Sequence, residues 1–240
     1  SSCLRLKEHL SARAVDFQSI NIAADPDGLA QLQELGVRTV PVVAKGAEYV
    51  MGLSLRDVGS FLGLDDEGAG MLPPHELVQR LDWILSAAQR YLRQLPDDQM
   101  LEELPGRPRS YRELTYHLFQ ISRAFLGVAS GEELTYEKLG EVAGDELVSF
   151  ADIADDGEAT RRDLIAWWDG QGGAMDFAAI VPTYYGPQSL HETLERTAWH
   201  TGQHVRQMLL ILDGLNIVPD GPIGERELAG LPLPKEVWDG

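Results

Sequence analysis

The sequence contains very little cysteine: Cys3 is the single one in 240 residues, which excludes an internal disulfide framework. The chain also lacks an uninterrupted apolar run close to the roughly 20 residues that a membrane helix needs. Its first residues are polar and contain no apolar signal segment. We therefore expect a soluble, cytoplasmic protein without a membrane partner.

Basic residues are also scarce, because 20 Lys and Arg stand against 38 Asp and Glu, a formal net charge of −18. A charge of this sign repels phosphate, which argues against nucleic acid as a partner. The acids concentrate in residues 131–160, where ten carboxylates accompany Lys138 alone. The favoured interpretation of this segment is a solvated connection between helices; an acidic docking surface is the alternative.

Residues 1–64 alternate helical and strand patterns, which predicts an α/β domain. Asp25-Pro26 is a typical helix start, Lys45-Gly46 is a typical turn between strands, and Ser54 is expected to cap a helix. In order, the patterns predict a helix, a strand, a helix, two strands and a helix, over residues 3–14, 15–22, 25–37, 38–52 and 54–64.

Residues 75–216 are helical in pattern, after a linker at 65–74 that is rich in Gly and acid. Ser110 and Glu113 form the sequence signature of a capping box. A tail at 217–240, too rich in Pro and Gly for a helix, is expected to lie over these helices and to be anchored by Trp238. Four helices are predicted, over residues 74–95, 110–129, 160–170 and 189–215, with one long crossover between the second and the third. The fold class is therefore a two-domain chain, in which an α/β domain precedes an all-α, up-down four-helix bundle.

Three histidines interrupt the apolar faces of the bundle helices. His200 and His204 are four residues apart, so their rings project from one face of the last helix, a spacing that suits two ligands of one metal ion. His117 lies in the apolar stripe of the second helix. A buried imidazole without a partner is costly, and a shared divalent metal would satisfy all three. The alternative is that each is a hydrogen-bonded core residue.

These residues carry a family resemblance over roughly residues 75 to 216. The segments are "ELTYHLFQ" with His117, "ERTAWHTGQHVRQ" with His200 and His204, and the lead-in "YYGPQSLHETL". The region resembles the DinB/YfiT-type metal-binding four-helix family, whose fold is shared by bacillithiol S-transferases and mycothiol-dependent maleylpyruvate isomerase. The resemblance implies that the three histidines bind one Zn²⁺ or Ni²⁺ with open coordination positions, and we favour zinc. Candidates for orienting the imidazoles are Glu113, Gln120 and Gln203.

The N-terminal part resembles a second family. "SSCLRLKEHL" is similar to the active-site helix of glutaredoxins and thioredoxins, and "GVRTVPVV" to their Thr-Val-Pro segment. The resemblance implies that Pro41 follows a cis peptide bond and that Arg38, Thr39 and Val40 flank a thiol-binding site. It also assigns Cys3 to the second, resolving position of the motif, and the first strand of the fold is missing. Either residues precede Ser1, which we favour, or the domain has lost its nucleophile.

Together the two halves predict a thiol-dependent metalloenzyme. In this hypothesis a low-molecular-weight thiol such as glutathione, mycothiol or bacillithiol attacks an electrophile in detoxification or stress response, and the glutaredoxin-like half performs thiol–disulfide exchange. Two alternatives remain open: a non-catalytic metal- or ligand-binding stress protein with a docking module, and a metal-dependent hydrolase. A homodimer is compatible with each. The expected pocket residues are Tyr184, Tyr185, Trp83 and Trp199.

Overall fold

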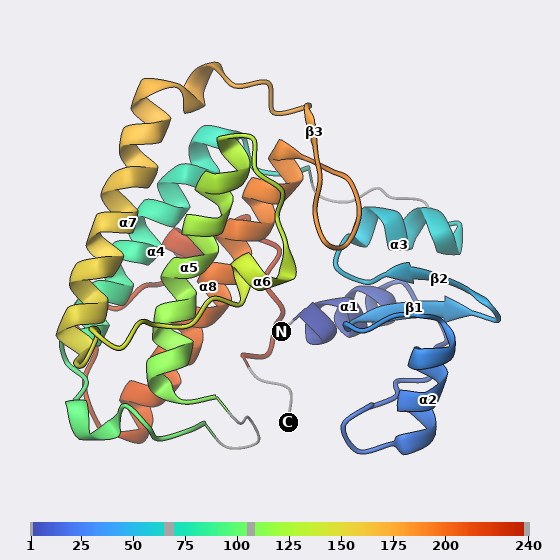
Figure 1. The fold of residues 1–240 in the computed structure, drawn as a ribbon, viewed down its shortest axis with the longest axis horizontal. Coiled ribbons are helices and arrows are strands. Elements are labelled where there is room, and N and C mark those ends of the chain that lie inside the picture. The colour runs from blue at the N-terminus through green and yellow to red at the C-terminus, as the bar shows by residue number, and fades with distance from the viewer. Residues whose placement is uncertain (1, 65–69, 105–108, 238–240) are drawn as a thin grey trace. The chain divides into compact units, whose positions relative to one another are not determined.

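The computed structural model describes residues 2–64, 70–104 and 109–237 (Figure 1). Trp238, the expected anchor of the tail, and residues 65–69 of the expected linker lie outside this part. Contacts divide the chain into two units, the described parts of Ser1–Ala69 with Pro234–Asp239, and Gly70–Leu233. Within the described residues, no helix has both the length and the apolar character needed to cross a membrane.

The first unit is a small α/β layer. Its helices are α1 (Ser2–Ala12), α2 (Pro26–Glu34) and α3 (Leu55–Leu62), and its antiparallel hairpin consists of β1 (Val42–Lys45) and β2 (Glu48–Met51). Leu6 and Leu10 of α1 and Val58 of α3 form its buried core. The three helices and the hairpin with its Lys45-Gly46 turn are confirmed, and they fit a thioredoxin-like fold.

Local hydrogen bonds explain where these helices begin. The Asp25 side chain accepts from the backbone N–H groups of Asp27 and Gly28, and Pro26 occupies the first helical position of α2, where no N–H is needed. The Ser54 hydroxyl accepts from the N–H of Asp57 at the start of α3. The expected caps are therefore confirmed.

The expected strand at 15–22 is wrong. This segment is mostly exposed and forms no ladder among the described residues, and Phe17 and Ile20 are more than one-third exposed. A strand needs a neighbour for its N–H and C=O groups, and β1 pairs with β2 instead. The alternation of apolar residues in 15–22 is therefore not sufficient to make a strand.

The second unit is a four-helix bundle made of α4 (Pro74–Leu92), α5 (Tyr111–Ala129), α7 (Phe150–Gly170) and α8 (Leu190–Gly214). Each of α4 and α5 packs against both α7 and α8, so the helices surround one apolar core (Figure 1). The shorter elements are η1 (Asp97–Gln99), α6 (Tyr136–Leu139), η2 (Gly172–Ala174), β3 (Ile180–Val181), β4 (Gln188–Ser189) and α9 (Glu225–Leu228).

Two predictions about the second unit are wrong. The third helix, α7, starts at Phe150 rather than at residue 160, because Ser149 and Asp152 form a capping box and a buried face follows it. Residues 150–160 therefore belong to a helix and not to the acidic connection. The tail contains one short helix, α9, although it was expected to contain none.

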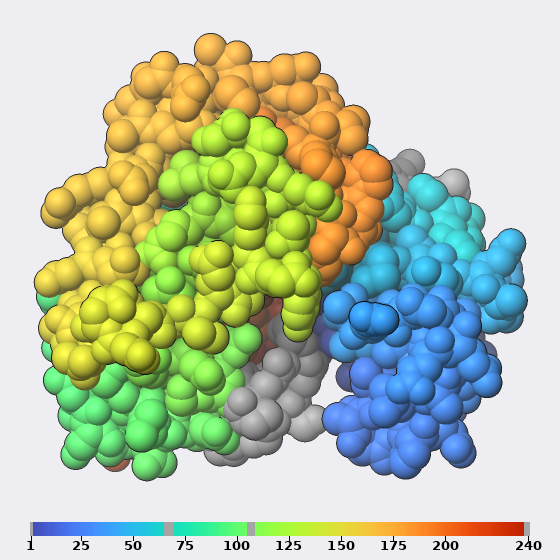
Figure 2. Space-filling model, in the orientation of Figure 1, coloured from blue at the N-terminus to red at the C-terminus, as the bar shows by residue number. Residues whose placement is uncertain are grey.

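The connection between α5 and α7 and the tail both cover the bundle. Residues of the connection, with the short helix α6, spread over one face of the bundle (Figure 2). The tail is fixed to α4 by side-chain to backbone bonds: the Arg90 guanidinium donates to the carbonyls of Asp220 and Gly221, and the Tyr91 hydroxyl accepts from the N–H of Ile223 at 2.7 Å. The described part of the tail up to residue 233 therefore lies on the bundle, as expected.

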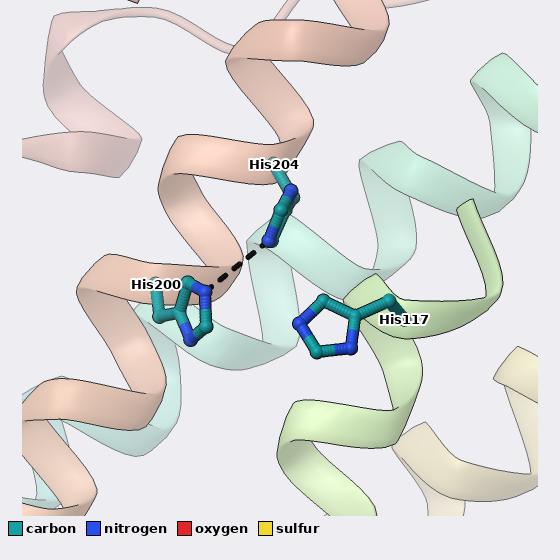
Figure 3. Close-up of side chains that lie close together, drawn as sticks. All are labelled: His117, His200 and His204. Atoms are coloured by element: carbon teal, nitrogen blue, oxygen red, sulfur yellow. Dashed lines mark hydrogen bonds between the residues drawn. The ribbon is translucent and has the colours of Figure 1, made fainter. Parts of the chain in front are cut away.

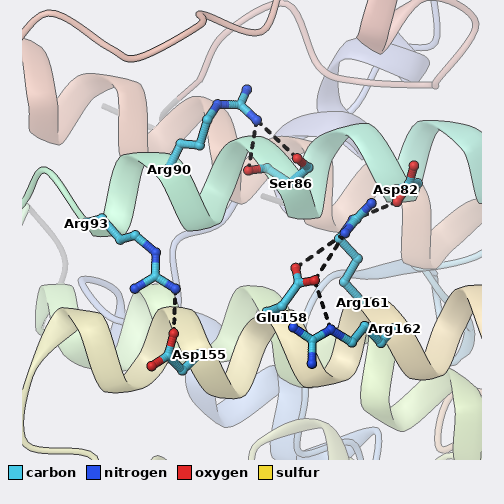
Figure 4. A network of polar contacts seen from close by, with 8 residues as sticks. All are labelled: Asp82, Ser86, Arg90, Arg93, Asp155, Glu158, Arg161 and Arg162. Carbon is cyan, nitrogen blue, oxygen red and sulfur yellow. Dashed lines mark hydrogen bonds and ion pairs between the residues drawn. The ribbon is translucent and has the colours of Figure 1, made fainter.

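A polar network joins the outer faces of α4 and α7 (Figure 4). The Arg161 guanidinium of α7 donates to Asp82 of α4 at 2.7 Å and to Glu158 one turn away at 3.3 Å. Arg93 pairs with Asp155 further along the same two helices. The Arg161–Asp82 pair is about 70 % buried, so it is less screened by solvent than an ordinary surface pair and fixes how the two helices align.

We expect Gly157→Ala to destabilise the bundle, although alanine favours a helix more than glycine does. A Cβ atom at position 157 would lie 2.5 Å from the Phe119 ring, which is fully buried. Overpacking of this kind costs about 1–3 kcal/mol in the free energy of unfolding, measurable by urea denaturation. Gly170→Ala on the same helix meets no neighbour and is the control. If both variants were equally stable, contact with Phe119 would not be what requires glycine.

Candidate metal centre

Three imidazoles meet between α5 and α8 (Figure 3). His117 projects from the middle of α5, and His200 and His204 project from one face of α8, one turn apart. Because α5 and α8 pack side by side, one ring nitrogen from each histidine can be chosen such that all three lie within 4.8 Å of one another. The structure therefore brings together the three residues predicted as ligands.

The spacing of the two histidine nitrogens on α8 suits a single small ion. Nε2 of His200 lies 3.3 Å from Nε2 of His204. Two ligands at 2.0–2.1 Å from one ion in tetrahedral geometry are roughly 3.3–3.4 Å apart. The His117 ring stands nearly perpendicular to that of His204, with centroids 5.1 Å apart. The three rings thus approach a common point from different directions.

Burial keeps all three imidazoles neutral. His117 and His204 are buried and His200 is partly exposed. Burial, together with the charges of Arg109 and Arg196, lowers the pKa of His117 to about 3. The pKa values of His200 and His204 are also lowered well below the usual value, first by burial. At neutral pH each ring therefore keeps one nitrogen lone pair, which is the form that binds a metal.

Two outer contacts orient the rings. Nδ1 of His204 lies 2.8 Å from Oε1 of Gln207. An amide oxygen can only accept, so Nδ1 carries the proton and Nε2 keeps its lone pair. The backbone carbonyl of Leu139 favours the protonated form of His117 and so raises its pKa, against the larger lowering by burial. Such contacts fix ring orientation around protein metal sites, and neither was predicted from the sequence.

The three residues expected in this orienting role have other contacts. Gln120 donates to the Lys138 carbonyl and to the Glu141 carboxylate, and Gln203 accepts from Arg206. Glu113 forms the capping box with Ser110. A glutamine three residues after a ligand, on the same helix face, is the signal that could have identified Gln207.

The residues present fit a divalent metal. Nδ1 of His200 is buried without a hydrogen-bond partner among the described residues, and its Nε2 faces His204 rather than an oxygen acceptor. Three neutral nitrogens suit Zn²⁺ or Ni²⁺ better than Mg²⁺ or Ca²⁺. Three protein ligands also leave at least one coordination position for water or substrate. The protein thus has a histidine triad that could hold a metal ion.

A cavity of about 240 Å³ reaches the triad at His117. It is bounded by α5 and by the connection that follows α6 and is lined by Arg109, Glu113, His117, Gly140, Glu141 and Val142. The guanidinium of Arg109 and the carboxylates of Glu113 and Glu141 therefore line the same cavity as His117. This arrangement is typical of a reactive site rather than of a sealed structural one.

The four aromatic residues expected at this pocket do not line it. Trp199 is buried beside His200, with ring centroids 5.6 Å apart, and Trp83 lines a separate cavity between α4 and the tail. Tyr184 and Tyr185 pack against Arg196, one turn before His200. The expectation placed them at the mouth; large aromatic side chains instead fill the core or cover a guanidinium.

The predicted thiol site is on the first unit. Val40–Pro41 is a cis peptide bond, and Cys3 lies in the first turn of α1, as expected. Leu6, on the same face of α1 as Cys3, comes so close to Gly52 that a Cβ there would lie 2.5 Å from it, and the N–H of Gly52 donates to the Pro41 carbonyl. The face of α1 that carries Cys3 therefore packs toward the Pro41 segment.

Exposure of this segment differs along its length. Pro41 is buried, whereas Arg38 is exposed and Val40 is 43 % exposed. Thr39 is intermediate. An exposed backbone edge beside a buried proline is the arrangement that extended peptides and peptide-like thiols can pair with.

Comparison with known families agrees with this architecture. A family model described as the DinB superfamily matches residues 80–208, and one described as Glutaredoxin matches residues 1–50. The fold and the histidine triad thus define a four-helix bundle of a metal-associated class preceded by a glutaredoxin-like part. Because the first match covers more than half of the sequence, the chain belongs to the DinB superfamily. Searches of curated proteins and of solved structures gave no match.

We expect His204→Ala to reduce bound zinc from about one ion per chain to nearly none, because two nitrogens rarely hold zinc in water. Metal analysis after dialysis against zinc measures this, and circular dichroism should show that the helices remain. His75→Ala, at an exposed position of α4, removes an imidazole outside the triad and is the control. Equal zinc in the two variants would refute the triad as the binding site.

We expect Gln207→Ala to weaken zinc binding by about 10- to 100-fold without abolishing it, because His204 loses the contact that fixes its proton and orientation. Competition with a chelating dye measures the affinity. Gln203→Ala removes an equally buried glutamine on the same helix whose amide bonds Arg206, and it should bind zinc as the native protein does. The reverse ranking of the two variants would mean that Gln203 orients the site.

Proposed function

We propose that this protein is a thiol-dependent metalloenzyme that transfers or exchanges a low-molecular-weight thiol on an electrophilic substrate. The observation that carries the proposal is the triad of neutral imidazoles at the end of a cavity, in a chain that also has a glutaredoxin-like part. The electrophile and the thiol enter as small molecules, in a detoxification or stress pathway. The favoured metal is zinc.

Each part of the bundle site has a distinct role in this reaction. A zinc ion held by the triad would supply a Lewis acid that favours thiolate over thiol. The Glu113 and Glu141 carboxylates border the cavity and can accept the proton that the thiol loses. The thiolate sulfur then uses its electron pair to form a bond to the electrophile; in a substitution the leaving group departs with the electron pair of the broken bond, and in an addition the adduct takes back the proton from the carboxylate. Trp199 and the apolar core exclude water from the inner side of the triad.

The glutaredoxin-like part suits the thiol itself. Arg38, Thr39 and Val40 offer a partly exposed backbone edge beside cis-Pro41 for a peptide-like thiol. Cys3 is a partly buried thiol in the first turn of a helix, a position that stabilises a thiolate. We assign thiol–disulfide exchange to this part, with Cys3 as the resolving thiol.

A second function, metal-dependent hydrolysis, is favoured by one specific feature. Carboxylates that border a metal site are the general bases of many hydrolytic enzymes, and Glu113 and Glu141 border the cavity at His117. In that case the open position would take water and no thiol would be required. Thiol dependence therefore separates the two functions.

We expect the cobalt(II)-substituted protein to develop a thiolate-to-cobalt charge-transfer band in the near ultraviolet when glutathione is added. S-methylglutathione, which has no thiol, should give no band, and His204→Ala should give none with either compound. Cys3→Ser should keep the band, because Cys3 is the single cysteine of the chain and the sulfur comes from the added thiol.

Two results would oppose the proposal. Absence of the band in a protein that holds stoichiometric cobalt would mean that the site does not bind thiols. Hydrolysis of an activated ester by the zinc-loaded protein, inhibited rather than assisted by glutathione, would favour the hydrolase instead. Both measurements use the full chain and require no knowledge of the natural electrophile.

A further inference from the structure

Arg196 is a buried cation for which the described residues provide no counter-ion. Its side chain lies on α8 and is only 6 % exposed. Among the described residues no carboxylate lies within ion-pair distance of it, although the chain has 38 acidic residues. Buried charges in proteins are normally paired, since an unpaired one costs several kcal/mol. A position with this cost requires an explanation.

Its present contacts use only part of its hydrogen-bonding capacity. Nη2 donates to the Tyr184 hydroxyl at 3.0 Å, and the guanidinium stands over the Tyr185 ring at 5.0 Å. Nε is buried and donates to no described residue. The tyrosines therefore hold the guanidinium in place, and Nε keeps an N–H that none of the described residues accepts.

Arg196 belongs to the same helix face as two of the metal ligands. Positions 196, 200 and 204 are four residues apart, so they lie one above the other with a rise of about 6 Å per step. The pKa values of His200 and His117 are lowered first by burial and, to a smaller extent, by the charge of Arg196. Arg109, at the cavity, acts on His117 and His204. Two guanidinium groups of this acidic protein therefore act on the triad, Arg196 from the same face of α8 and Arg109 from the cavity that Glu113 and Glu141 also border.

We infer that Arg196 binds a carboxylate of the molecule that occupies the histidine triad. This inference rests on the proposed function and adds the substrate class: one of the two reactants carries a carboxylate about one helical turn from its reacting atom. A guanidinium matches a carboxylate in charge and in its planar pair of donors. A phosphate, with nearly two negative charges at neutral pH, would bring an uncompensated charge into the buried site.

The carboxylate has two possible sources, the thiol or the electrophile. A first pair of probes places it on the thiol: 3-mercaptopropionate is compared with 3-mercaptopropan-1-ol. A second pair places it on the other reactant: succinate is compared with succinamide, each added to zinc-loaded protein saturated with 3-mercaptopropan-1-ol. Calorimetric titration gives the four dissociation constants for the full chain.

Arg196→Gln is the informative variant. We expect it to weaken binding of the carboxylate probe by about 10- to 100-fold in one pair, the loss expected for hydrogen bonds to a charged group, and to leave the neutral probe unchanged. Arg196→Lys keeps the charge without the planar fork and should give an intermediate loss. Arg162→Gln removes an exposed arginine of α7 and is the control for net charge.

Stability distinguishes a binding residue from a structural one. Arg196→Met fills the same space without a charge, so we expect the ligand-free protein to melt at the same temperature or about 2–4 °C higher. A structural arginine would give the opposite result, because its loss would open the packing around Tyr184 and Tyr185. This measurement does not depend on activity.

The outcomes separate the two proposals. Equal affinities of native protein for the carboxylate and neutral probes in both pairs would overturn the role of Arg196, whereas binding of the neutral thiol would still support the thiol-dependent function. If zinc-loaded protein bound neither thiol, the proposed function would fail.

Succinate binding to metal-free protein, lost in Arg196→Gln, would in that case still support the anion site at Arg196. A lower melting temperature of Arg196→Met together with unchanged carboxylate binding would overturn it.

Discussion

Three imidazoles between α5 and α8 must each satisfy two nitrogens in a place that water scarcely reaches. Burial lowers the pKa of each ring, so the rings stay neutral and cannot use a second proton to satisfy a nitrogen. Gln207 satisfies one nitrogen of His204. Nε2 of His204 and Nε2 of His200 face each other at 3.3 Å, and a metal ion shared with His117 would satisfy both. The proposed function follows from that requirement.

The bundle supplies the precision that such a site needs. α5, α7 and α8 each begin with a capping box, formed by a serine and an acidic residue three positions later: Ser110, Ser149 and Ser189 with Glu113, Asp152 and Glu192. Each box fixes the residue at which its helix begins, and therefore which residues face inward. The position of His117 relative to His200 depends on two of these starts.

The sequence allowed the two-part architecture and the triad to be predicted, because both depend on local periodicity and on histidines four residues apart. It did not predict the strandless segment 15–22, whose state depends on whether a neighbouring strand is present. It also did not predict the early start of α7, because four acidic residues in 150–160 interrupt the apolar pattern of the buried face. Arg196 and Gln207 were missed since their importance lies in what surrounds them, which spacing alone does not show.

The connection between α5 and α7 has a kinetic consequence. Its acidic residues lie on the surface of the bundle, and Glu141 also borders the cavity. An anion that approaches His117 is therefore repelled by these carboxylates, and Arg109 at the cavity offsets only part of that repulsion. Added salt shortens the range of that repulsion to within a few ångströms of the surface. Small anions should then enter faster as ionic strength increases, the reverse of the behaviour of enzymes that steer charged substrates by attraction.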